Sequence, residues 1–334
     1  MAQKKRRKRR RKYKIHITLP QGVVFALTAI CLLLGVQVSL NGEIGGAPTW
    51  NDLYELFHLS VQPKGLADLP EDAQAVHFID IGQGDATLLQ SGQEYCLVDA
   101  GLPDSEEALL NYLDAQGVKR LKLLVMSHPH ADHIGSMKAV LEQIPVDQIL
   151  LPDFDKAPYP TSRTFERVME TIAKKKIPTV TAKEGRVFEI GDATLTVIAD
   201  GVKTDNFNDL SQVLAYKAPG LSVVLSGDGE KAVEQDAVAA GNISHADVFK
   251  AGHHGSNTSN SMDFLQAIRP QFVVISCGKD NSYGHPHKEP MQRFKMAGAQ
   301  VLRTDQNGSV VIAAGEQGLE CYAEDAQESS DQAA

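Results

Sequence analysis

Histidines gather in three short stretches of this 334-residue chain. Seven of the eleven lie in these stretches, as His128/His130/His133, His253/His254 and His285/His287. An H-x-H pair directs two imidazoles at one cation, and the Asp132-His133 pair that follows can hold a second one. Neutral imidazole and carboxylate suit zinc, manganese or iron. A polar turn with capping residues is the alternative, but four ligand-type residues within six positions favour a metal site.

Other ligand-type residues also follow apolar, strand-like runs. Asp228 is placed either to bridge two metal ions or to cap the helix that follows it, and the nearby histidine cluster favours bridging. Of His253 and His254, one imidazole can complete the shell of the second metal while its neighbour orients or protonates the substrate. His285 and His287 have no carboxylate beside them, so contact with the substrate or its leaving group fits them better than primary ligation.

The runs that carry these motifs predict strands and helices in a regular order. Strand patterns cover 76–82, 85–90, 94–100, 121–127, 194–199, 211–218, 221–227, 246–251, 271–277 and 309–314. Helical patterns cover 105–116, 229–240, 261–268 and 289–297. Strands that first form meanders and later alternate with helices predict two packed sheets with helices outside them.

Together the motifs resemble the metallo-β-lactamase superfamily, and within it the hydrolase domain of ComEC-type DNA-uptake proteins and their single-domain relatives. The matching segments run in family order between Ala75 and Tyr322, and they are 78–86, 98–101, 127–135, 208–211, 226–228, 250–259 and 281–287. The resemblance implies an α/β fold, an αββα sandwich, with the metal site at one edge between the sheets. One transmembrane helix is expected to precede this sandwich.

The resemblance also implies two divalent metal ions, zinc or manganese. The implied ligands are His128 and His130 for the first ion, Asp132, His133 and His254 for the second, and Asp228 between them. His254 is preferred to His253 because it matches the position that completes the second site in similar choline-phosphate esterases. Asp99 matches an aspartate that supports the site from the end of its own strand.

Asn208 is a departure from the family pattern. It stands where many members place a further histidine, and an amide oxygen is a weaker and harder ligand than imidazole. If Asn208 is a ligand, the first ion is predicted to be labile and to favour manganese over zinc. The alternative is that Asn208 caps a turn before the strand at 211–218 and never approaches the metal.

Two ions about 3.5–4 Å apart lower the pKa of a bridging water toward 7, which gives a hydroxide, and polarise a phosphoryl oxygen. The predicted catalytic residues are Asp132, His253 and His285, with His253 or His285 assisting the leaving oxygen. The predicted substrate-binding residues are Asp80, Gln83 and Asp85 of the glycine-rich IDIGQGDA loop, together with Ser256 and His287.

Charge is distributed unevenly along the chain. There are 33 Lys+Arg and 42 Asp+Glu residues, but residues 1–14 hold ten bases and no acid, so the remainder carries a net charge of −19. This acidic remainder of the chain argues against a large basic surface that binds the phosphate backbone of nucleic acid. A local patch of Lys250, Lys279 and Lys288 would oppose that average.

The basic segment precedes an apolar run at 23–40, whose 18 residues would span roughly 27 Å as a helix. The positive-inside rule places the N-terminus in the cytoplasm and the rest outside. The expected organisation is a basic tail (1–14) that touches anionic lipid, a signal-anchor (15–41), a linker (42–72), the catalytic domain (73–322) and a disordered acidic tail (323–334). A cleaved signal peptide is the alternative, although no A-x-A site follows the run.

The predicted function is that of a membrane-anchored, extracytoplasmic phosphodiesterase of nuclease type, which acts on nucleic acid or a phosphate-bearing envelope polymer. The alternatives are a choline-phosphate or envelope-polymer esterase, a lactam hydrolase, and a surface binding module with a degenerate site. Nearly complete ligands argue against the binding module. ComEC-type proteins attach this domain to a multi-helix channel, so DNA import by this chain alone is not expected. No obligate protein partner is evident.

Four scattered cysteines without a C-x-x-C pair exclude a zinc ribbon and a dense disulfide framework. Cys96 and Cys277 are predicted to be buried thiols, and the pairing of Cys277 with Cys321 is left open.

Overall fold

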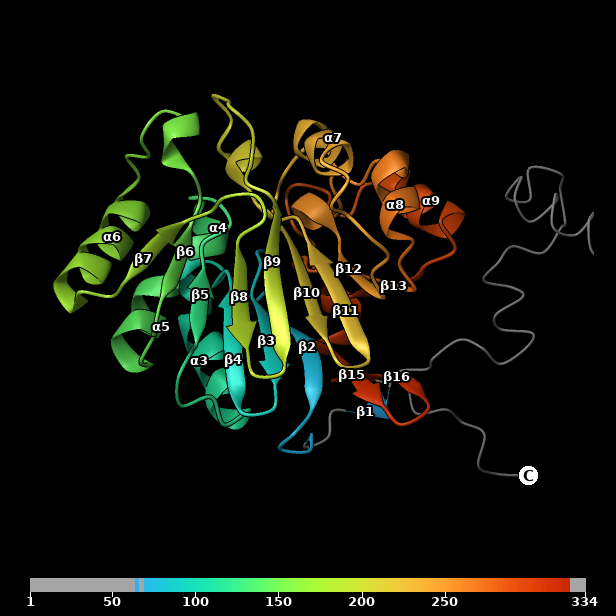
Figure 1. Cartoon of the computed structure of the whole chain (residues 1–334), viewed down its shortest axis with the longest axis horizontal. Coiled ribbons are helices and arrows are strands. Elements are labelled where there is room, and N and C mark those ends of the chain that lie inside the picture. Colours follow the sequence, from blue (N-terminus) through green and yellow to red (C-terminus); the bar gives the residue numbers. More distant parts are fainter. Residues whose placement is uncertain (1–63, 66–68, 325–334) are drawn as a thin grey trace, which may run out of the picture. The chain divides into compact units, whose positions relative to one another are not determined.

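The computed structural model describes residues 64–65 and 69–324, which form two β-sheets flanked by helices (Figure 1). The predicted span at 23–40, the basic tail and residues 325–334 lie outside the described residues. Within the described part of the chain, no helix is long and apolar enough to cross a membrane.

The first sheet holds nine strands in the order β1-β16-β15-β2-β3-β4-β5-β6-β7. Their bounds are β1 Lys64–Gly65, β2 Gln74–Phe78, β3 Thr87–Ser91, β4 Glu94–Val98, β5 Leu123–Val125, β6 Ile149–Leu151, β7 Thr179–Thr181, β15 Val310–Gly315 and β16 Gly318–Ala323. β2, β3 and β4 form an antiparallel meander, and β4 to β7 are parallel.

The second sheet holds seven strands in the order β14-β13-β12-β11-β10-β9-β8. Their bounds are β8 Val187–Ile190, β9 Ala193–Ala199, β10 Val213–Ala218, β11 Leu221–Leu225, β12 Val248–Lys250, β13 Phe272–Ile275 and β14 Gln300–Arg303. β8 to β11 are antiparallel, whereas β11 to β14 are parallel.

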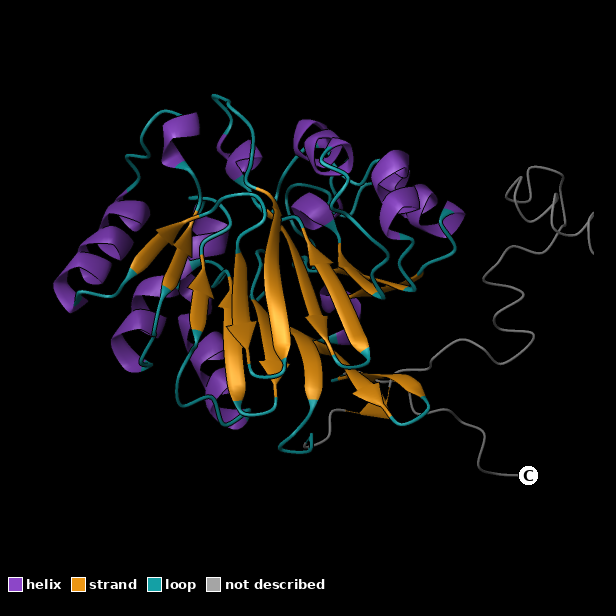
Figure 2. Cartoon of the chain, viewed as in Figure 1, coloured by secondary structure: helices purple, strands orange, loops and turns teal. Residues whose placement is uncertain are grey.

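Helices cover the outer face of each sheet (Figure 2). The α-helices are α3 Glu106–Ala115, α4 Ala131–Ile134, α5 Met137–Gln143, α6 Arg163–Lys175, α7 Lys231–Ala239, α8 Met262–Ile268, α9 Lys288–Met296 and α10 Thr304–Asn307. The 3-10 turns are η1 Pro103–Ser105, η2 Phe154–Lys156, η3 Phe207–Leu210 and η4 Gly252–Gly255.

Three apolar layers account for this arrangement. The central layer takes side chains from both sheets, among them Phe78, Leu195 and Phe272. The outer layers lie between one sheet and its helices, with Phe165 of α6 in one and Phe264 of α8 in the other. Strands β12 and β13 are buried at every residue, and β11 at every residue except Ser222, because a helix layer covers one face and the other sheet covers the opposite face. The predicted αββα sandwich is confirmed.

The structure differs from the sequence patterns near the predicted site. The run at 76–82 is a strand only as far as Phe78, and 79–86 is a loop in which Gly82 and Gly84 have positive φ. The HPHADH motif does not lie wholly on a loop, because Asp132 and His133 belong to α4. Residues Lys64 and Gly65 of the expected linker pair with β16 at the sheet edge.

The patterns predict no element between 134 and 190, where the structure has α5, β6, α6, β7 and β8. The three strands have only three or four residues each, too few to show a reliable period. For helix α6 the sequence does contain an N-cap residue, Ser162. Its hydroxyl accepts a hydrogen bond from the Phe165 amide and caps the first turn. Cys96, Cys277 and Cys321 are buried free thiols, so Cys277 and Cys321 do not pair.

Candidate metal centre

The predicted ligands come from loops at the carboxyl ends of strands in both sheets. His128 follows β5, Asp228 follows β11, and His253 and His254 follow β12. Parallel neighbours end at the same edge of a sheet, and the packing of the two sheets brings these edges together, so His128 and Asp228 meet although they are 100 positions apart.

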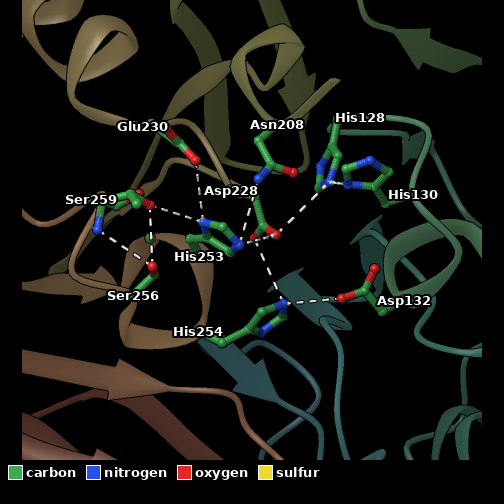
Figure 3. Close-up of polar contacts among 12 residues, drawn as sticks. His128, His130, Asp132, Asn208, Asp228, Glu230, His253, His254, Ser256 and Ser259 are labelled. Atoms are coloured by element: carbon green, nitrogen blue, oxygen red, sulfur yellow. Dashed lines mark hydrogen bonds and ion pairs between the residues drawn. The ribbon is translucent and has the colours of Figure 1, made fainter. Parts of the chain in front are cut away.

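Asp228 lies at the centre of this group (Figure 3). Its Oδ1 is 3.2 Å from His133 Nε2 and 3.7 Å from His254 Nε2. Its Oδ2 is 3.6 Å from His253 Nε2 and 3.8 Å from His128 Nε2. Each oxygen of one carboxylate therefore faces its own pair of imidazoles, which is the arrangement a bridging ligand requires.

His130 and Asp132, the remaining members of the H-x-H/D-H motif, each lie near the imidazoles that face one oxygen of Asp228. His130 Nδ1 is 3.0 Å from His128 Nε2, on the side of Asp228 Oδ2. Asp132 Oδ2 is 3.3 Å from His254 Nε2, on the side of Asp228 Oδ1. Asp132 and His130 are only partly buried, so the group is accessible from their side.

Several buried polar atoms at this centre lack a hydrogen-bond partner. They are Asp85 Oδ1, His133 Nε2, Asn208 Oδ1, Asp228 Oδ1 and His254 Nε2. Unsatisfied buried groups are costly and call for an explanation. Asp85, His133, Asp228 and His254 each offer a ligand atom, and these atoms lie within 4.8 Å of one another. Oxygen and imidazole donors that converge in this way fit a divalent cation.

Neighbouring groups orient the buried imidazoles. Asp99 Oδ2 accepts hydrogen bonds from His133 Nδ1 at 2.7 Å and from Ser127 Oγ at 2.6 Å. His254 Nδ1 donates to the carbonyl oxygen of Ser276 at 3.0 Å. With the ring proton on Nδ1, each Nε2 presents its lone pair toward Asp228, as is usual for metal-binding histidines.

The electrostatics of the cluster are dominated by burial and by the carboxylates. Burial alone would lower the pKa of His133 and His254, but Asp228, with Asp99 or Asp85, raises the pKa of His133 well above 6.5 and that of His254 to about 10. Burial would raise the pKa of Asp228, but His133 and His254 hold it well below its usual range. In the absence of a bound cation, the protonated rings of His133 and His254 therefore balance the negative charge of Asp228.

His128 differs from the other buried imidazoles. Burial lowers its pKa well below 6.5, and the charge of His133 lowers it further. The ring is therefore neutral near pH 7, which is the form that binds metal.

Asp85 and Lys250 form a buried ion pair below the centre. Lys250 Nζ lies 2.9 Å from Asp85 Oδ2 and donates to the Ala251 carbonyl at 2.8 Å. Lys250 is 2% exposed and Asp85 is 3% exposed. The predicted substrate contact by Asp85 and the predicted surface patch containing Lys250 do not fit this placement, because both charges are neutralised in the interior.

The other predicted substrate-binding residues hold loops together. Gln83 Oε1 accepts from the Gly278 amide at 3.0 Å, and His287 Nδ1 accepts from the Asn257 amide at 3.0 Å. Ser256 is buried, with its Oγ 3.1 Å from Thr258 Oγ1, so substrate contact by Ser256 also does not fit.

Asp80 is partly buried in the same glycine-rich loop as Gln83. Its Oδ1 accepts from the Gly82 amide at 3.0 Å. The Asp80 carboxylate therefore shapes the turn at the start of the loop.

His285 lies at the edge of the cluster and is 9% exposed. Its ring centroid is 5.5 Å from that of His253, and the ring of Tyr283 stacks on its other side at 5.7 Å. Burial and the neighbouring imidazoles lower the pKa of His285 to about 4. A neutral His285 donates or accepts a hydrogen bond near pH 7 but carries no proton to release.

Asn208 lies beside His253, with 3.5 Å between Asn208 Nδ2 and His253 Nε2 (Figure 3). The turn is capped by another residue, since Asn206 Oδ1 accepts from the Asn208 amide at 3.2 Å. The Asn208 side chain therefore faces His253 and does not cap this turn.

Glycines allow two close approaches at the centre. A Cβ on Gly84 would lie 2.4 Å from the Asp132 carbonyl oxygen, and φ at Gly84 is +134°. A Cβ on Gly227 would lie 2.8 Å from Ser211 Oγ, and φ there is +51°. These positions bring the glycine-rich loop close to the loop that carries Asp132, and the loop that carries Asp228 close to the segment before β10.

Two residues near His253 were not predicted from the sequence. Thr258 Oγ1 is 3.2 Å and Glu230 Oε1 is 3.9 Å from His253 Nδ1. Both lie within the motifs that carry Asp228 and His253, but sequence proximity does not reveal which side chain turns toward the ring.

The sequence was compared with family models once this geometry was known. The model for the metallo-beta-lactamase superfamily matches residues 79–279, which include the ends of β5, β11 and β12. The chain belongs to the metallo-beta-lactamase superfamily. As in other members of the superfamily, its Asp/His cluster forms the candidate divalent metal site of a hydrolase.

Curated relatives of this superfamily member are ComEC-type competence proteins. ComE operon protein 3 of Bacillus subtilis is 32% identical over 309 residues, covering 86% of this chain and 38% of the relative. Competence protein ComA of Neisseria gonorrhoeae is 31% identical over 300 residues, covering 89% of this chain and 39% of the relative. The chain thus spans less than two thirds of the length of these relatives, and the predicted ComEC-type resemblance is confirmed.

Two solved structures are similar to the chain at low sequence identity. The metallo-beta-lactamase fold protein YhfI from Bacillus subtilis is 14% identical with a TM-score of 0.47, covering 70% of this chain and 96% of that one. The CmlA beta-hydroxylase E377D mutant is 14% identical with a TM-score of 0.48, covering 81% and 61%.

Proposed function

We propose that this hydrolase is a metal-dependent phosphodiesterase of nuclease type with two divalent ions, zinc or manganese. The observation that carries the proposal is the division of four imidazoles between the two oxygens of Asp228. One carboxylate that faces two donor sets suits a pair of ions, and paired ions are common in phosphodiester cleavage.

When bound, the ions supply Lewis acidity toward a phosphoryl oxygen and lower the pKa of a bound water. The protein holds the metal ligands in position. Asp99 and the Ser276 carbonyl fix His133 and His254, while Asp132 lies at the accessible side next to His254. These contacts hold the donors in place before a substrate arrives, which reduces the reorganisation required during the reaction.

His285 is placed to contact the leaving oxygen. Because its pKa is about 4, the ring is neutral near pH 7 and contributes a hydrogen bond from a ring N–H rather than a full proton. His285 Nδ1 is buried and has no hydrogen-bond partner, so a contact with the leaving oxygen would have to use Nε2. This specifies the assistance to the leaving oxygen predicted for His285.

Nucleic acid is the substrate we favour over an envelope polymer. One relative is named Competence protein ComA, and another is Recombination protein 2 of Haemophilus influenzae, 29% identical over 243 residues. The Tyr283 ring is 64% exposed and is stacked on His285, so it offers a rigid aromatic face on which a base can stack. Because the chain after residue 14 is acidic, we favour a nucleic-acid contact limited to the metal centre over an extended basic surface along the phosphate backbone.

A substrate screen of the purified full-length chain tests this function. After dialysis, the protein is reloaded with zinc or manganese and offered single-stranded and duplex DNA, RNA, bis-p-nitrophenyl phosphate, a phosphorylcholine ester and a lactam. We expect metal-dependent cleavage of DNA and of bis-p-nitrophenyl phosphate. Turnover of only the phosphorylcholine ester or only the lactam would contradict the proposal, and a chain that binds no metal would indicate a binding module.

Placement at the outer face of a membrane is part of the same proposal. The support is the basic segment at 1–14 before the apolar run at 23–40. Protease added to intact cells is expected to digest the catalytic domain. Protection of that domain until the cells are lysed would contradict the orientation, and a soluble product beginning near residue 41 would indicate signal cleavage.

A further inference from the structure

We propose that His253 supplies the third imidazole ligand of the first metal ion, at the place left by Asn208. This inference rests on the two-metal centre proposed above. It assigns His253 to metal binding, in place of the proton-transfer role that its position in the sequence suggests.

The first observation is the grouping of donors around Asp228. Its Oδ2 faces His253 Nε2 at 3.6 Å and His128 Nε2 at 3.8 Å, and its Oδ1 faces His133 and His254. His253 therefore shares an oxygen with the H-x-H side of the centre, whereas its neighbour His254 belongs to the other side.

With His253 included, the donor sets of the two sides become equal in number. The side of Asp228 Oδ2 holds three imidazoles, those of His128, His130 and His253. The side of Asp228 Oδ1 holds Asp132, His133 and His254. Each side thus has three protein donors and one oxygen of the shared carboxylate. Each ion then has the four donors that zinc usually has.

The second observation concerns the contacts of the two ring nitrogens of His253. Its Nδ1 lies 3.2 Å from Thr258 Oγ1 and 3.9 Å from Glu230 Oε1. Its Nε2 lies 3.6 Å from Asp228 Oδ2 and 3.5 Å from the Asn208 amide nitrogen. His253 therefore presents Nε2 to Asp228, as His128, His133 and His254 do.

The third observation is the backbone at this position. His253 has φ 50° and ψ 49°, and His254 has φ 51° and ψ 28°, so two consecutive non-glycine residues are left-handed. This conformation is unfavourable for residues with a Cβ and is concentrated at functional sites. It directs adjacent side chains to different oxygens of the same carboxylate, which an extended or right-handed helical segment would not do.

Hydrogen bonds hold this segment in place. The His253 amide donates to the Gly227 carbonyl at 3.0 Å, beside Asp228. The Asn260 side chain accepts from the Gly252 amide at 2.8 Å and donates to the Gly252 carbonyl at 2.9 Å. The loop that carries His253 is thus anchored to the loop that carries the bridging carboxylate.

Asn208 then has a different role from the one predicted for it. Its amide nitrogen faces His253, so Asn208 is a positioning residue that acts through the imidazole. The first ion keeps three imidazoles, and we expect it to retain zinc rather than to be labile and selective for manganese.

Zinc retention by the full-length chain tests the assignment. The wild type, His253→Gln, Asn208→Ala and the exposed control His245→Gln are loaded with zinc, dialysed and measured for metal content and zinc affinity. We expect two equivalents in the wild type and the control, and one in His253→Gln, whose weaker site loses at least about tenfold in affinity. Asn208→Ala should keep two equivalents.

A rescue variant separates a lost ligand from a damaged fold. Adding Asn208→His to His253→Gln returns an imidazole to the same side of Asp228, and we expect the second equivalent to return. Circular dichroism of each variant reports the fold independently of metal.

Two results would overturn the inference. The first is a His253→Gln protein that keeps two zinc ions with wild-type affinity. The second is an Asn208→Ala protein that loses one ion when His253→Gln does not, which would make Asn208 the ligand. A wild type that never binds more than one ion would instead refute the two-metal centre itself.

Discussion

Replacing Asp228 with asparagine is expected to lower kcat/KM for a phosphodiester at least about a thousandfold. Asp228 is the one group whose two oxygens face both donor sets, so its loss removes a negative charge from both sides at once. The amide keeps the size of the side chain, so the change isolates charge. The measurements are steady-state kinetics with bis-p-nitrophenyl phosphate and metal content after dialysis.

Asp263→Asn is the matched control, because Asp263 is an exposed carboxylate in the first turn of α8. It should change neither metal content nor kcat/KM. If Asp228→Asn retained two ions and wild-type turnover, a bridging role for Asp228 would be excluded. If Asp263→Asn lost activity as well, the effect would reflect general damage to the fold.

Lys250→Met is expected to lower the free energy of unfolding by about 3–5 kcal/mol. Lys250 neutralises Asp85 in the interior, and its removal leaves the Asp85 carboxylate with only the more distant His254 imidazole, whose Nδ1 lies 3.5 Å from Asp85 Oδ1. Methionine keeps most of the length and apolar volume of the lysine side chain. Urea denaturation of the metal-free protein measures the change, so that any effect on metal affinity does not contribute.

Two further variants distinguish the ion pair from simple packing. Lys217→Met on β10 is the matched control, and because Lys217 is exposed it should change stability by less than about 0.5 kcal/mol. Lys250→Met combined with Asp85→Leu removes both charges and should recover part of the loss. A Lys250→Met protein as stable as the Lys217→Met control would show that the pair does not contribute to stability.

The amino-acid sequence alone determined the class of protein and the chemistry of its site. Apolar runs of strand length, separated by glycine turns and followed by helical patterns, were enough to predict two packed sheets with helices outside them, because these periods reflect which faces are buried. The cluster from His128 to His133 and the carboxylate at Asp228 indicated a divalent metal site, since these residue types are the common ligands of such ions.

The tertiary structure alone decided how the remaining residues are used. Lys250 and Asp85 looked like surface or substrate-contact residues, yet they neutralise each other in the interior. Asn208 and Asn206 are equally suited to cap a turn by type, but only Asn206 does so. His253 and His254 are adjacent in sequence, but left-handed backbone angles direct them to different oxygens of Asp228.

The physical reason is that these contacts join strand ends from two different sheets. Asp85 and Lys250 are 165 positions apart, and His128 and Asp228 are 100 positions apart. Local patterns report burial and backbone preference within one element. They carry no information on which loops meet at an edge once the sheets have packed, and this packing determines which atom each side chain faces.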